Sequence, residues 1–162
     1  MSSTKQAPNA GNAYCARHAK LLLHSFEKLT GRVLLEPVGD DTELAKALYE
    51  ADFVVVSHGT EPDPVFNYAN SLAQDLFEMG WEEFIKLPSR LSAEAVHRDE
   101  RARLMQSVTS QGYIDDYAGI RISKSGRRFR IEAATVWNLL DADNVYRGQA
   151  ATFDRWQTLE AY

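Results

Sequence analysis

The amino-acid sequence predicts an α+β fold, in which helices are inserted between the two halves of a hairpin-rich antiparallel sheet. Three observations support this prediction. Two short strand segments are expected within residues 53–69, capped amphipathic helices surround them, and residues 114–153 hold three longer strand segments separated by turns. The 162 residues are 44% hydrophobic and 25% charged, which is typical of one globular domain with its own core.

The chain begins with small and polar residues, and we expect a disordered tail over residues 1–12. A helix follows, because Leu22, Phe26 and Leu29 recur at helical spacing. Gly31 then supplies a C-terminal cap, since glycine adopts the left-handed conformation that ends many helices.

A second helix is predicted to begin after Asp40, with Glu43 completing a capping box. The expected organisation is therefore a single domain over residues 13–156. It consists of an N-terminal helical extension, 13–51, and a sheet-containing core, 52–154.

The core opens with a strand at residues 53–57, which contains three consecutive valines. After a proline-stiffened turn, residues 65–69 form a second short strand. Asn70 then caps a helix, and Ser92 caps a longer one that ends at Gly112.

The last third of the chain is predicted to be β. Residues 114–123 and 127–139 read as two strands joined at Lys124-Ser125-Gly126, a typical hairpin turn. A second turn at 141–144 leads into the final strand at 145–153. The predicted helical stripes 22/26/29 and 44/48 should cover the face of the sheet that carries Ile120 and Ile122, within the same chain or across a dimer.

Charge and cysteine content narrow the functional classes. The net charge of −5 argues against non-specific binding to nucleic acid or to an anionic membrane. The single cysteine, Cys15, fits a reducing compartment, and no apolar run approaches the roughly 20 residues of a membrane span. We therefore expect a cytoplasmic protein. An organellar transit peptide is the alternative, because the first 26 residues lack Asp and Glu.

Several strings of residues resemble those of one known family. They are Ser57-His58-Gly59, Asp63-Pro64-Val65-Phe66-Asn67-Tyr68-Ala69-Asn70, Leu87-Pro88-Ser89-Arg90, Asp116-Tyr117-Ala118-Gly119-Ile120-Arg121-Ile122, Gly126-Arg127-Arg128-Phe129-Arg130-Ile131, Val136-Trp137-Asn138-Leu139 and Gly148-Gln149-Ala150-Ala151. Over about residues 21–156 the chain closely resembles the MEKHLA domain family, a PAS-like group. The resemblance implies a PAS-like fold, with a five-stranded antiparallel sheet and helices over one face.

The same resemblance bears on function without naming an activity. In plants the domain is similar to the C-terminal part of homeodomain–leucine zipper regulators, whereas in bacteria and algae it is usually a small protein alone. This sequence has no basic recognition helix and no leucine heptads, so no DNA-binding half is expected in it.

Cofactor and catalytic chemistry are not predicted. PAS-fold photosensors bind flavin through asparagines that would fall on Arg121 and Ile131, and Cys15 precedes the core. His97 is the one candidate ligand for haem, and it is better interpreted as a partly exposed helix residue. No spacing of histidines or cysteines predicts a metal site. Ser57 and His58 cannot form a dyad, because adjacent strand residues point to opposite faces. We therefore expect no cofactor, no metal, no catalytic residue and no enzymatic activity.

One candidate ligand pocket remains. In the hairpin alignment with PAS-fold proteins, Arg121 falls at a pocket-facing position, next to Tyr117 and across from Phe129 and Ile131. A buried arginine cannot lose its charge, so it needs a protein carboxylate, such as Asp75 or Glu78, or an anionic ligand. The alternative is that the side chain of Arg121 turns outward and is exposed to solvent. The full candidate set is Arg121, Tyr117, Asn138, Gln149 and Trp137.

These residues lead to two functional hypotheses. The first is a PAS-like sensory or regulatory module that binds a small carboxylate-bearing ligand and signals by contact with a protein partner. The second is a ligand-free dimerisation or protein-interaction module whose pocket is filled by its own side chains. A cavity above about 300 Å³ with convergent polar groups would favour the first, and an exposed apolar sheet face would favour the second.

Overall fold

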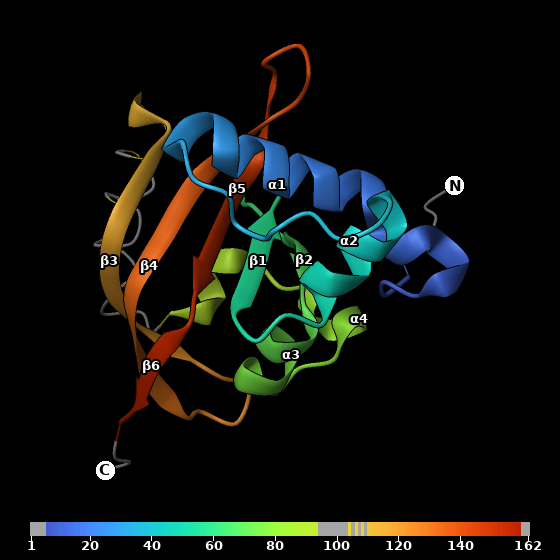
Figure 1. The fold of residues 1–162 in the computed structure, drawn as a ribbon. Helices are drawn as coiled ribbons and strands as arrows, with labels where there is room; N and C mark the ends of the chain where they lie inside the picture. The colour runs from blue at the N-terminus through green and yellow to red at the C-terminus, as the bar shows by residue number, and fades with distance from the viewer. Residues whose placement is uncertain (1–5, 94–103, 105, 107, 109, 160–162) are drawn as a thin grey trace.

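Six antiparallel strands form the sheet in the computed structural model, which describes residues 6–93, 104, 106, 108 and 110–159 (Figure 1). Five of them follow the order β2-β1-β5-β4-β3, so that the last predicted strand lies between the two halves of the sheet. The strands are β1 (Val54–His58), β2 (Phe66–Ala69), β3 (Tyr113–Ile122), β4 (Arg128–Leu140), β5 (Tyr146–Phe153) and β6 (Arg155–Thr158). The α+β prediction is confirmed, with β6 as an addition.

The additional strand β6 exists because β4 is longer than its neighbour. β5 pairs with the second half of β4, up to the pair Thr135↔Thr152. The chain then turns at Asp154, and β6 pairs with the first half of β4, beginning at Glu132↔Arg155. Between the two sets of pairs, Ala133 has a φ of 51°, a conformation that marks an irregularity in the strand. Two successive strands therefore share one edge of β4.

Three helix ends lie at capping residues that the sequence predicts, namely Gly31, Asp40 and Asn70. The helices are a 3₁₀-helix (Ala10–Cys15), α1 (Ala16–Thr30), α2 (Asp41–Tyr49), α3 (Ser71–Phe77), α4 (Trp81–Phe84) and a second 3₁₀-helix (Ser89–Ser92). Gly31 has a φ of 73° and donates its N–H to the carbonyl oxygen of Glu27. Asp40 accepts a hydrogen bond of 2.9 Å from the N–H of Glu43.

One prediction for a helical segment differs from the structure, and another lies mostly outside the described residues. Asn9 caps the 3₁₀-helix Ala10–Cys15, so residues 10–12 belong to the folded chain and not to a disordered tail. Ser92 ends the second 3₁₀-helix and donates its hydroxyl to the carbonyl of Ser89. The longer helix predicted after it lies mostly outside the described residues, and the helical residues described there end at Gly112, whose N–H bonds to Val108.

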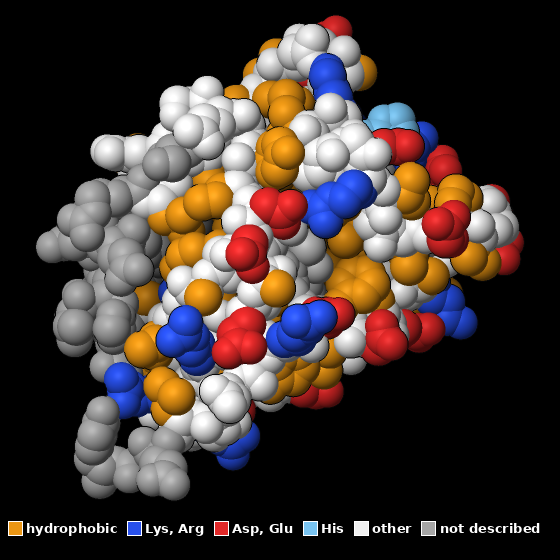
Figure 2. All heavy atoms as spheres, turned by 60° about the vertical axis from the view of Figure 1, so that its left-hand side comes forward, with side chains coloured by type: hydrophobic (Ala, Val, Ile, Leu, Met, Phe, Trp, Pro, Cys, Tyr) orange, Lys and Arg blue, Asp and Glu red, His pale blue; other side chains and the backbone are white. Residues whose placement is uncertain are grey.

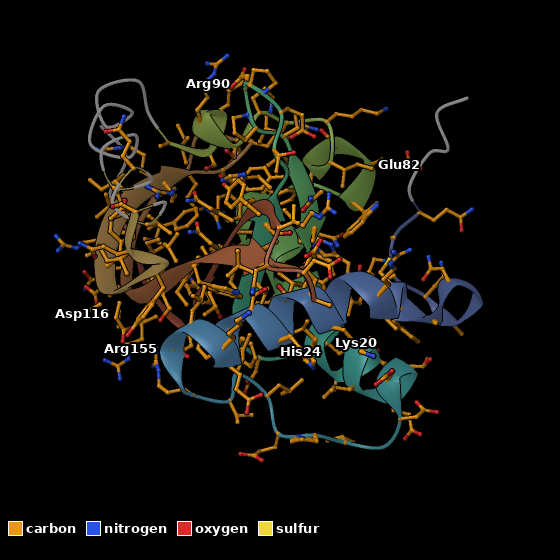
Figure 3. The ribbon with its side chains drawn as sticks, turned by 90° about the horizontal axis from the view of Figure 1, so that it is seen from above. Lys20, His24, Glu82, Arg90, Asp116 and Arg155 are labelled. Atoms are coloured by element: carbon orange, nitrogen blue, oxygen red, sulfur yellow. The ribbon has the colours of Figure 1, made fainter. Side chains whose placement is uncertain are left out.

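Helices cover both faces of the sheet (Figure 3). Seen from above, α1 with Lys20 and His24 lies on one side, whereas Glu82 and Arg90 lie on the other. On the inner face, α3 and α4 pack against the sheet in a core whose members include Val54, Val56, Phe66, Ala73, Phe77, Phe84, Phe129, Ile131, Val136 and Phe153. On the outer face, α1 and α2 pack in a core whose members include Ala19, Leu22, Phe26, Ala45, Leu48, Val55, Tyr68, Trp137, Leu139 and Ala150.

The N-terminal helices therefore cover the second face within the same chain, but not at the residues we expected. Their apolar stripes lie over Trp137 and Leu139 of β4, because α1 crosses the sheet mainly above that strand. Ile120 and Ile122, near the end of β3, are only half-buried. The expected contact with these two isoleucines is wrong.

The turn between β3 and β4 is tied to the end of α3 by one carboxylate. The N–H of Lys124 donates to the carbonyl of Phe77 at 3.0 Å, and the hydroxyl of Ser123 donates to Glu78 at 2.5 Å. Ser125 also donates to Glu78, and Arg127 lies 3.7 Å from it. The hydrogen bond from Ser123, followed by that from Ser125, lowers the pKa of Glu78 below its usual 4.5.

This contact predicts a specific sensitivity to acid. Because the pKa of Glu78 is lower in the folded chain than in the unfolded chain, its stabilising effect is present above 4.5 and is lost as the pH falls through the lowered pKa. The melting temperature of Glu78→Gln should therefore fall less than that of the wild type on acidification below 4.5. Thermal melts across pH 2.5–6, with both proteins in one buffer series, measure the difference at about half-unit steps.

Glu83→Gln is the control, because it removes an exposed ion pair to Lys124 beside the same turn. It should retain the acid response of the wild type. Equal acid responses of Glu78→Gln and wild type would show that the Glu78 contact does not stabilise the fold.

Candidate functional site

A small cavity lies on the inner face of the sheet, between the strands and the covering helices. Its volume is about 50 Å³. It is lined by Val56, Ser57, His58, Phe66, Phe77, Ser92, Tyr117, Arg121, Ile131, Val136, Gln149, Ala150, Ala151 and Phe153. Three of the five predicted site residues, Tyr117, Arg121 and Gln149, are therefore brought together from β3 and β5.

Arg121 is the most unusual residue of this cavity, because only 7% of it is exposed. Its Nη1 donates to the carbonyl of Ile120 at 2.9 Å, and its Nη2 donates to the hydroxyl of Tyr117 at 3.1 Å. The guanidinium carbon lies 5.5 Å from the centre of the Tyr117 ring. Among the described residues no carboxylate lies within ion-pair distance of Arg121; of the two predicted partners, Glu78 instead holds the hairpin turn.

The register of the hairpin explains how these groups meet. Arg121 pairs with Phe129 and Gly119 pairs with Ile131, as the hairpin alignment predicts. Gly119 is required for space, since a Cβ there would lie 2.3 Å from the hydroxyl oxygen of Tyr117. Tyr117 can therefore lean along the strand and reach the guanidinium.

Asn138 lies next to the cavity and holds one of its lining residues, Gln149. Its side-chain oxygen accepts a hydrogen bond of 3.0 Å from Nε2 of Gln149, and its Nδ2 donates to the carbonyl of Val108 at 3.0 Å. Both amides are nearly fully buried. Asn138 therefore orients Gln149 and links β4 and β5 to the helical segment at Val108, without lining the cavity itself.

Trp137 does not belong to this site. It is completely buried on the outer face, where its ring meets that of Phe26 edge-to-face at 5.0 Å. Adjacent residues of a strand point to opposite faces. Because Asn138 points to the inner face, where it bonds Gln149 of the cavity, its neighbour Trp137 points away from the cavity. Its expected place in the pocket is wrong.

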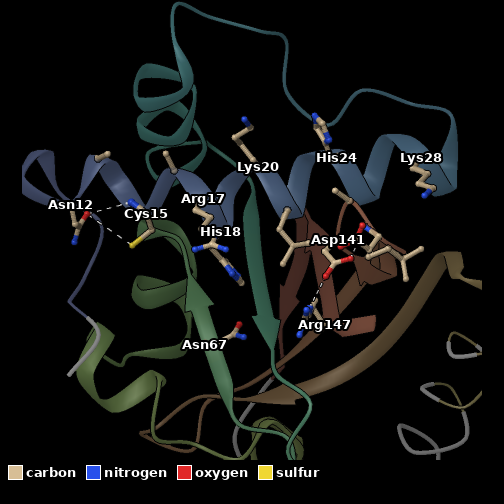
Figure 4. Close-up of a pocket in the computed structure, with 16 residues that line it drawn as sticks. Asn12, Cys15, Arg17, His18, Lys20, His24, Lys28, Asn67, Asp141 and Arg147 are labelled. Atoms are coloured by element: carbon tan, nitrogen blue, oxygen red, sulfur yellow. Dashed lines mark hydrogen bonds and ion pairs between the residues drawn. The ribbon is translucent and has the colours of Figure 1, made fainter. Parts of the chain in front are cut away.

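A second hollow, called here the α1 groove, lies on the outer face (Figure 4). It is open, has a volume of about 1400 Å³, and runs between α1, Asn67 of β2 and the turn between β4 and β5. Its lining residues are Asn12, Ala13, Cys15, Ala16, Arg17, His18, Lys20, Leu21, His24, Lys28, Asn67, Leu140, Asp141, Ala142, Asp143 and Arg147.

A polar cluster joins α1 to the sheet beside this groove. Nε2 of His18 lies 2.9 Å from the hydroxyl of Ser57, which donates to the side-chain oxygen of Asn67 at 2.5 Å. The His18 ring also stacks on Tyr68. The pairing of β1 with β2 changes register between Ser57 and His58, beside this cluster. Sequence reasoning missed this cluster, because no local signal places His18 near Ser57.

Other candidate chemistry has no counterpart in the part of the chain that the structure describes. Within it, no three His, Cys, Asp or Glu side chains gather as a metal ion would require. No described helix combines the length and the hydropathy needed to cross a membrane. His97 lies outside the described residues.

The sheet order, the hairpin and the inner-face helices give this chain a PAS-like fold, and solved structures agree. The PAS domain of a protein from Colwellia psychrerythraea superimposes with a TM-score of 0.60 at 14% identity, covering 72% of this chain and 94% of that one. A fungal LOV-domain photoreceptor gives a TM-score of 0.58 at 14% identity, covering 88% and 91%. At these identities the likeness establishes the fold alone.

The family model of the MEKHLA domain matches residues 16–158, so this chain belongs to the MEKHLA family. The homeobox-leucine zipper protein ATHB-9 of Arabidopsis thaliana is 32% identical over 123 residues, which is 73% of this chain. HOX9 of Oryza sativa subsp. indica is 24% identical over 139 residues, or 85% of this chain. The chain spans only 14% and 16%, respectively, of the length of these relatives.

Proposed function

We propose that this MEKHLA domain is a sensory or regulatory module whose inner cavity binds a small carboxylate-bearing ligand at Arg121 and which signals by protein contact. One observation carries the proposal. Arg121 is buried, lines a cavity, and has no carboxylate partner among the described residues. A buried guanidinium retains its charge, so an anion in the cavity would supply the missing partner.

The size of the cavity limits the ligand. Its 50 Å³ is about a third of the roughly 150 Å³ that holds benzene in an engineered apolar site. It also falls far below the roughly 300 Å³ typical of sites for larger metabolites. The smallest carboxylates, such as formate and acetate, are therefore the ligands that this cavity favours.

The polar groups present suit such an anion. A guanidinium offers five N–H donors, of which two are used by Ile120 and Tyr117, and it binds a carboxylate through two parallel hydrogen bonds. Gln149 brings a side-chain amide to the same wall, held by Asn138. The remaining lining is largely apolar, which strengthens a charge-assisted hydrogen bond by excluding water.

The alternative, a ligand-free interaction module, is favoured by the small volume of the cavity. It also needs an apolar surface for a partner. In the part of the chain that the structure describes, the large exposed hydrophobic residues are Val33, Val38, Val145 and Tyr146, and they lie on loops and at a strand end. On the face seen in Figure 2, hydrophobic side chains occur in small groups among charged ones, with no broad apolar area. We therefore place the ligand-binding function first.

The test is a thermal-shift series with formate, acetate and glycolate. An acid present at about 100 times its dissociation constant should stabilise the wild type by about 2.7 kcal/mol. Arg121→Ala should lose this response, because the anion loses its charged partner. Chloride at matched ionic strength corrects for non-specific salt effects.

Two further variants separate binding from structure. Arg130→Ala removes an exposed arginine of the same hairpin and should leave the response intact. Arg121→Met should stabilise the ligand-free protein by about 1 kcal/mol, because it replaces a buried charge that has no carboxylate partner among the described residues with an apolar side chain. The proposal is wrong if no acid stabilises the wild type, or if Arg121→Ala responds as the wild type does.

A further inference from the structure

The α1 groove is positively charged, although the chain as a whole carries a net charge of −5. Its lining includes four Lys or Arg side chains and two histidines, but only two carboxylates, those of Asp141 and Asp143. The groove lies on the outer face, across the sheet from the Arg121 cavity. It therefore represents a separate site.

Internal contacts already satisfy part of this charge. Asp141 accepts hydrogen bonds from the N–H groups of Val145 and Asp143 and from Nε of Arg147 at 2.9 Å. The backbone hydrogen bond from Val145 is the largest effect that lowers the pKa of Asp141, so this residue stays ionised and paired with Arg147. Lys20 forms an ion pair of 3.2 Å with Asp41, a residue that does not line the groove.

Two cations remain uncompensated within the described residues. Arg17 is exposed and has no ion pair there, and the side chain of Lys28 donates to the neutral amide oxygen of Asn144. Together with Leu21 and His24 they follow the spacing i, i+4, i+7 and i+11, which places all four on one stripe of α1. The stripe is about 16 Å long at 1.5 Å per residue.

The walls of the groove are held in place before anything binds. The hydroxyl of Ser25 donates to the carbonyl of Leu140 at 3.1 Å and accepts from its N–H at 2.8 Å, which fixes α1 against the end of β4. On the other side, His18 is bonded to Ser57, which is bonded to Asn67. A preformed groove avoids the cost of ordering its walls on association.

We propose that the α1 groove binds an extended acidic segment of a partner protein, with Asp or Glu at alternate positions. Alternate side chains of an extended chain are about 6.6 Å apart, close to the 6 Å between residues four apart on a helix. Two carboxylates of such a segment can therefore contact His24 and Lys28, a further one can contact Arg17, and an apolar side chain can contact Leu21.

Other occupants fit the groove less well. It is larger and more open than the 300–1,000 Å³ typical of small-molecule sites. Nucleic acid carries about one charge per 1.7 Å of duplex, and its backbone would meet Asp141 and Asp143 in the groove wall. A segment with spaced carboxylates can avoid both aspartates.

The test uses a fluorescein-labelled peptide in which every second residue is glutamate except one, which is leucine, so that the leucine lies on the same face as the glutamates. Binding is followed by fluorescence anisotropy. Arg17→Glu/Lys28→Glu should weaken binding about tenfold or more, and added salt should weaken wild-type binding. The matched control is Lys86→Glu/Arg130→Glu, which makes the same change of net charge at two exposed residues outside the groove. It should change the affinity by less than about twofold.

Several outcomes would overturn the proposal. They are no binding of the peptide, equal weakening by both double variants, and tighter binding of a single-stranded oligonucleotide that is lost in the groove variant. Arg121→Ala should bind the peptide as the wild type does, and Arg17→Glu/Lys28→Glu should keep its thermal response to small acids. Failure at the groove is therefore distinguishable from failure at the cavity.

Discussion

Replacing Asn70 with alanine is expected to lower the free energy of unfolding by about 4 kcal/mol, a large part of the stability of a domain of this size. The side chain is fully buried. Its oxygen accepts from the N–H groups of Val55 at 3.1 Å and Ala73 at 3.2 Å, and its Nδ2 donates to the carbonyls of Leu48 at 3.2 Å and Phe53 at 2.8 Å. Alanine would remove this partner from all four backbone groups, although the carbonyl of Leu48 keeps its hydrogen bond from the N–H of Ala51.

Urea titration followed by circular dichroism measures this loss. Asn70→Asp tests the two donated bonds separately, because a carboxylate can accept from Val55 and Ala73 but cannot donate to Leu48 and Phe53. Asn9→Ala is the matched control, since Asn9 is itself exposed where it caps the first 3₁₀-helix, and its loss should cost only about 1 kcal/mol. A loss below about 1 kcal/mol in Asn70→Ala would contradict the central role assigned to this side chain.

The second large effect is expected at Trp137, where alanine should cost about 3–5 kcal/mol. The ring is fully buried under α1, packs edge-to-face on Phe26, and fills the centre of the outer core. Its indole N–H has no hydrogen-bond partner among the described residues, so Trp137→Phe should be much milder. The same urea titrations measure both variants.

Trp156→Ala provides the control of equal size. Trp156 lies on β6, is only half-buried, and contacts Phe153 edge-to-face at 6.0 Å. Its loss should cost clearly less than that of Trp137. Comparable losses at both tryptophans would mean that the packing under α1 contributes no more to the free energy of unfolding than the packing at the edge of the sheet.

The elements that sequence reasoning placed well are those that local chemistry determines. Gly31 and Asp40 end and begin helices because of their own backbone and side-chain preferences. The hairpin of β3 and β4 follows from alternation and from the turn residues between them. In contrast, β6 depends on an irregularity at Ala133 and a turn at Asp154, which have no distinctive residues.

The candidate site shows the same division. Tyr117 and Arg121 lie four residues apart in β3, an even spacing that puts both on one face, and the structure places both at the cavity. The same rule separates Trp137 from Asn138, and applying it there would have removed Trp137 from the pocket. The cluster of His18, Ser57 and Asn67 joins distant parts of the chain through a register shift, and no periodicity encodes such a contact.

The sheet order has a consequence for synthesis on the ribosome. β1 is buried along its whole length, yet it pairs with β5. Val54 therefore cannot pair until Phe153, near the end of the domain, has been synthesised. During translation, β1 and β2 can pair with each other, but the other edge of β1 stays open until β5 has emerged. Non-local pairing of this kind slows folding and leaves an apolar strand edge accessible to aggregation or to chaperones. For this domain, the vulnerable interval lasts until the penultimate strand leaves the exit tunnel.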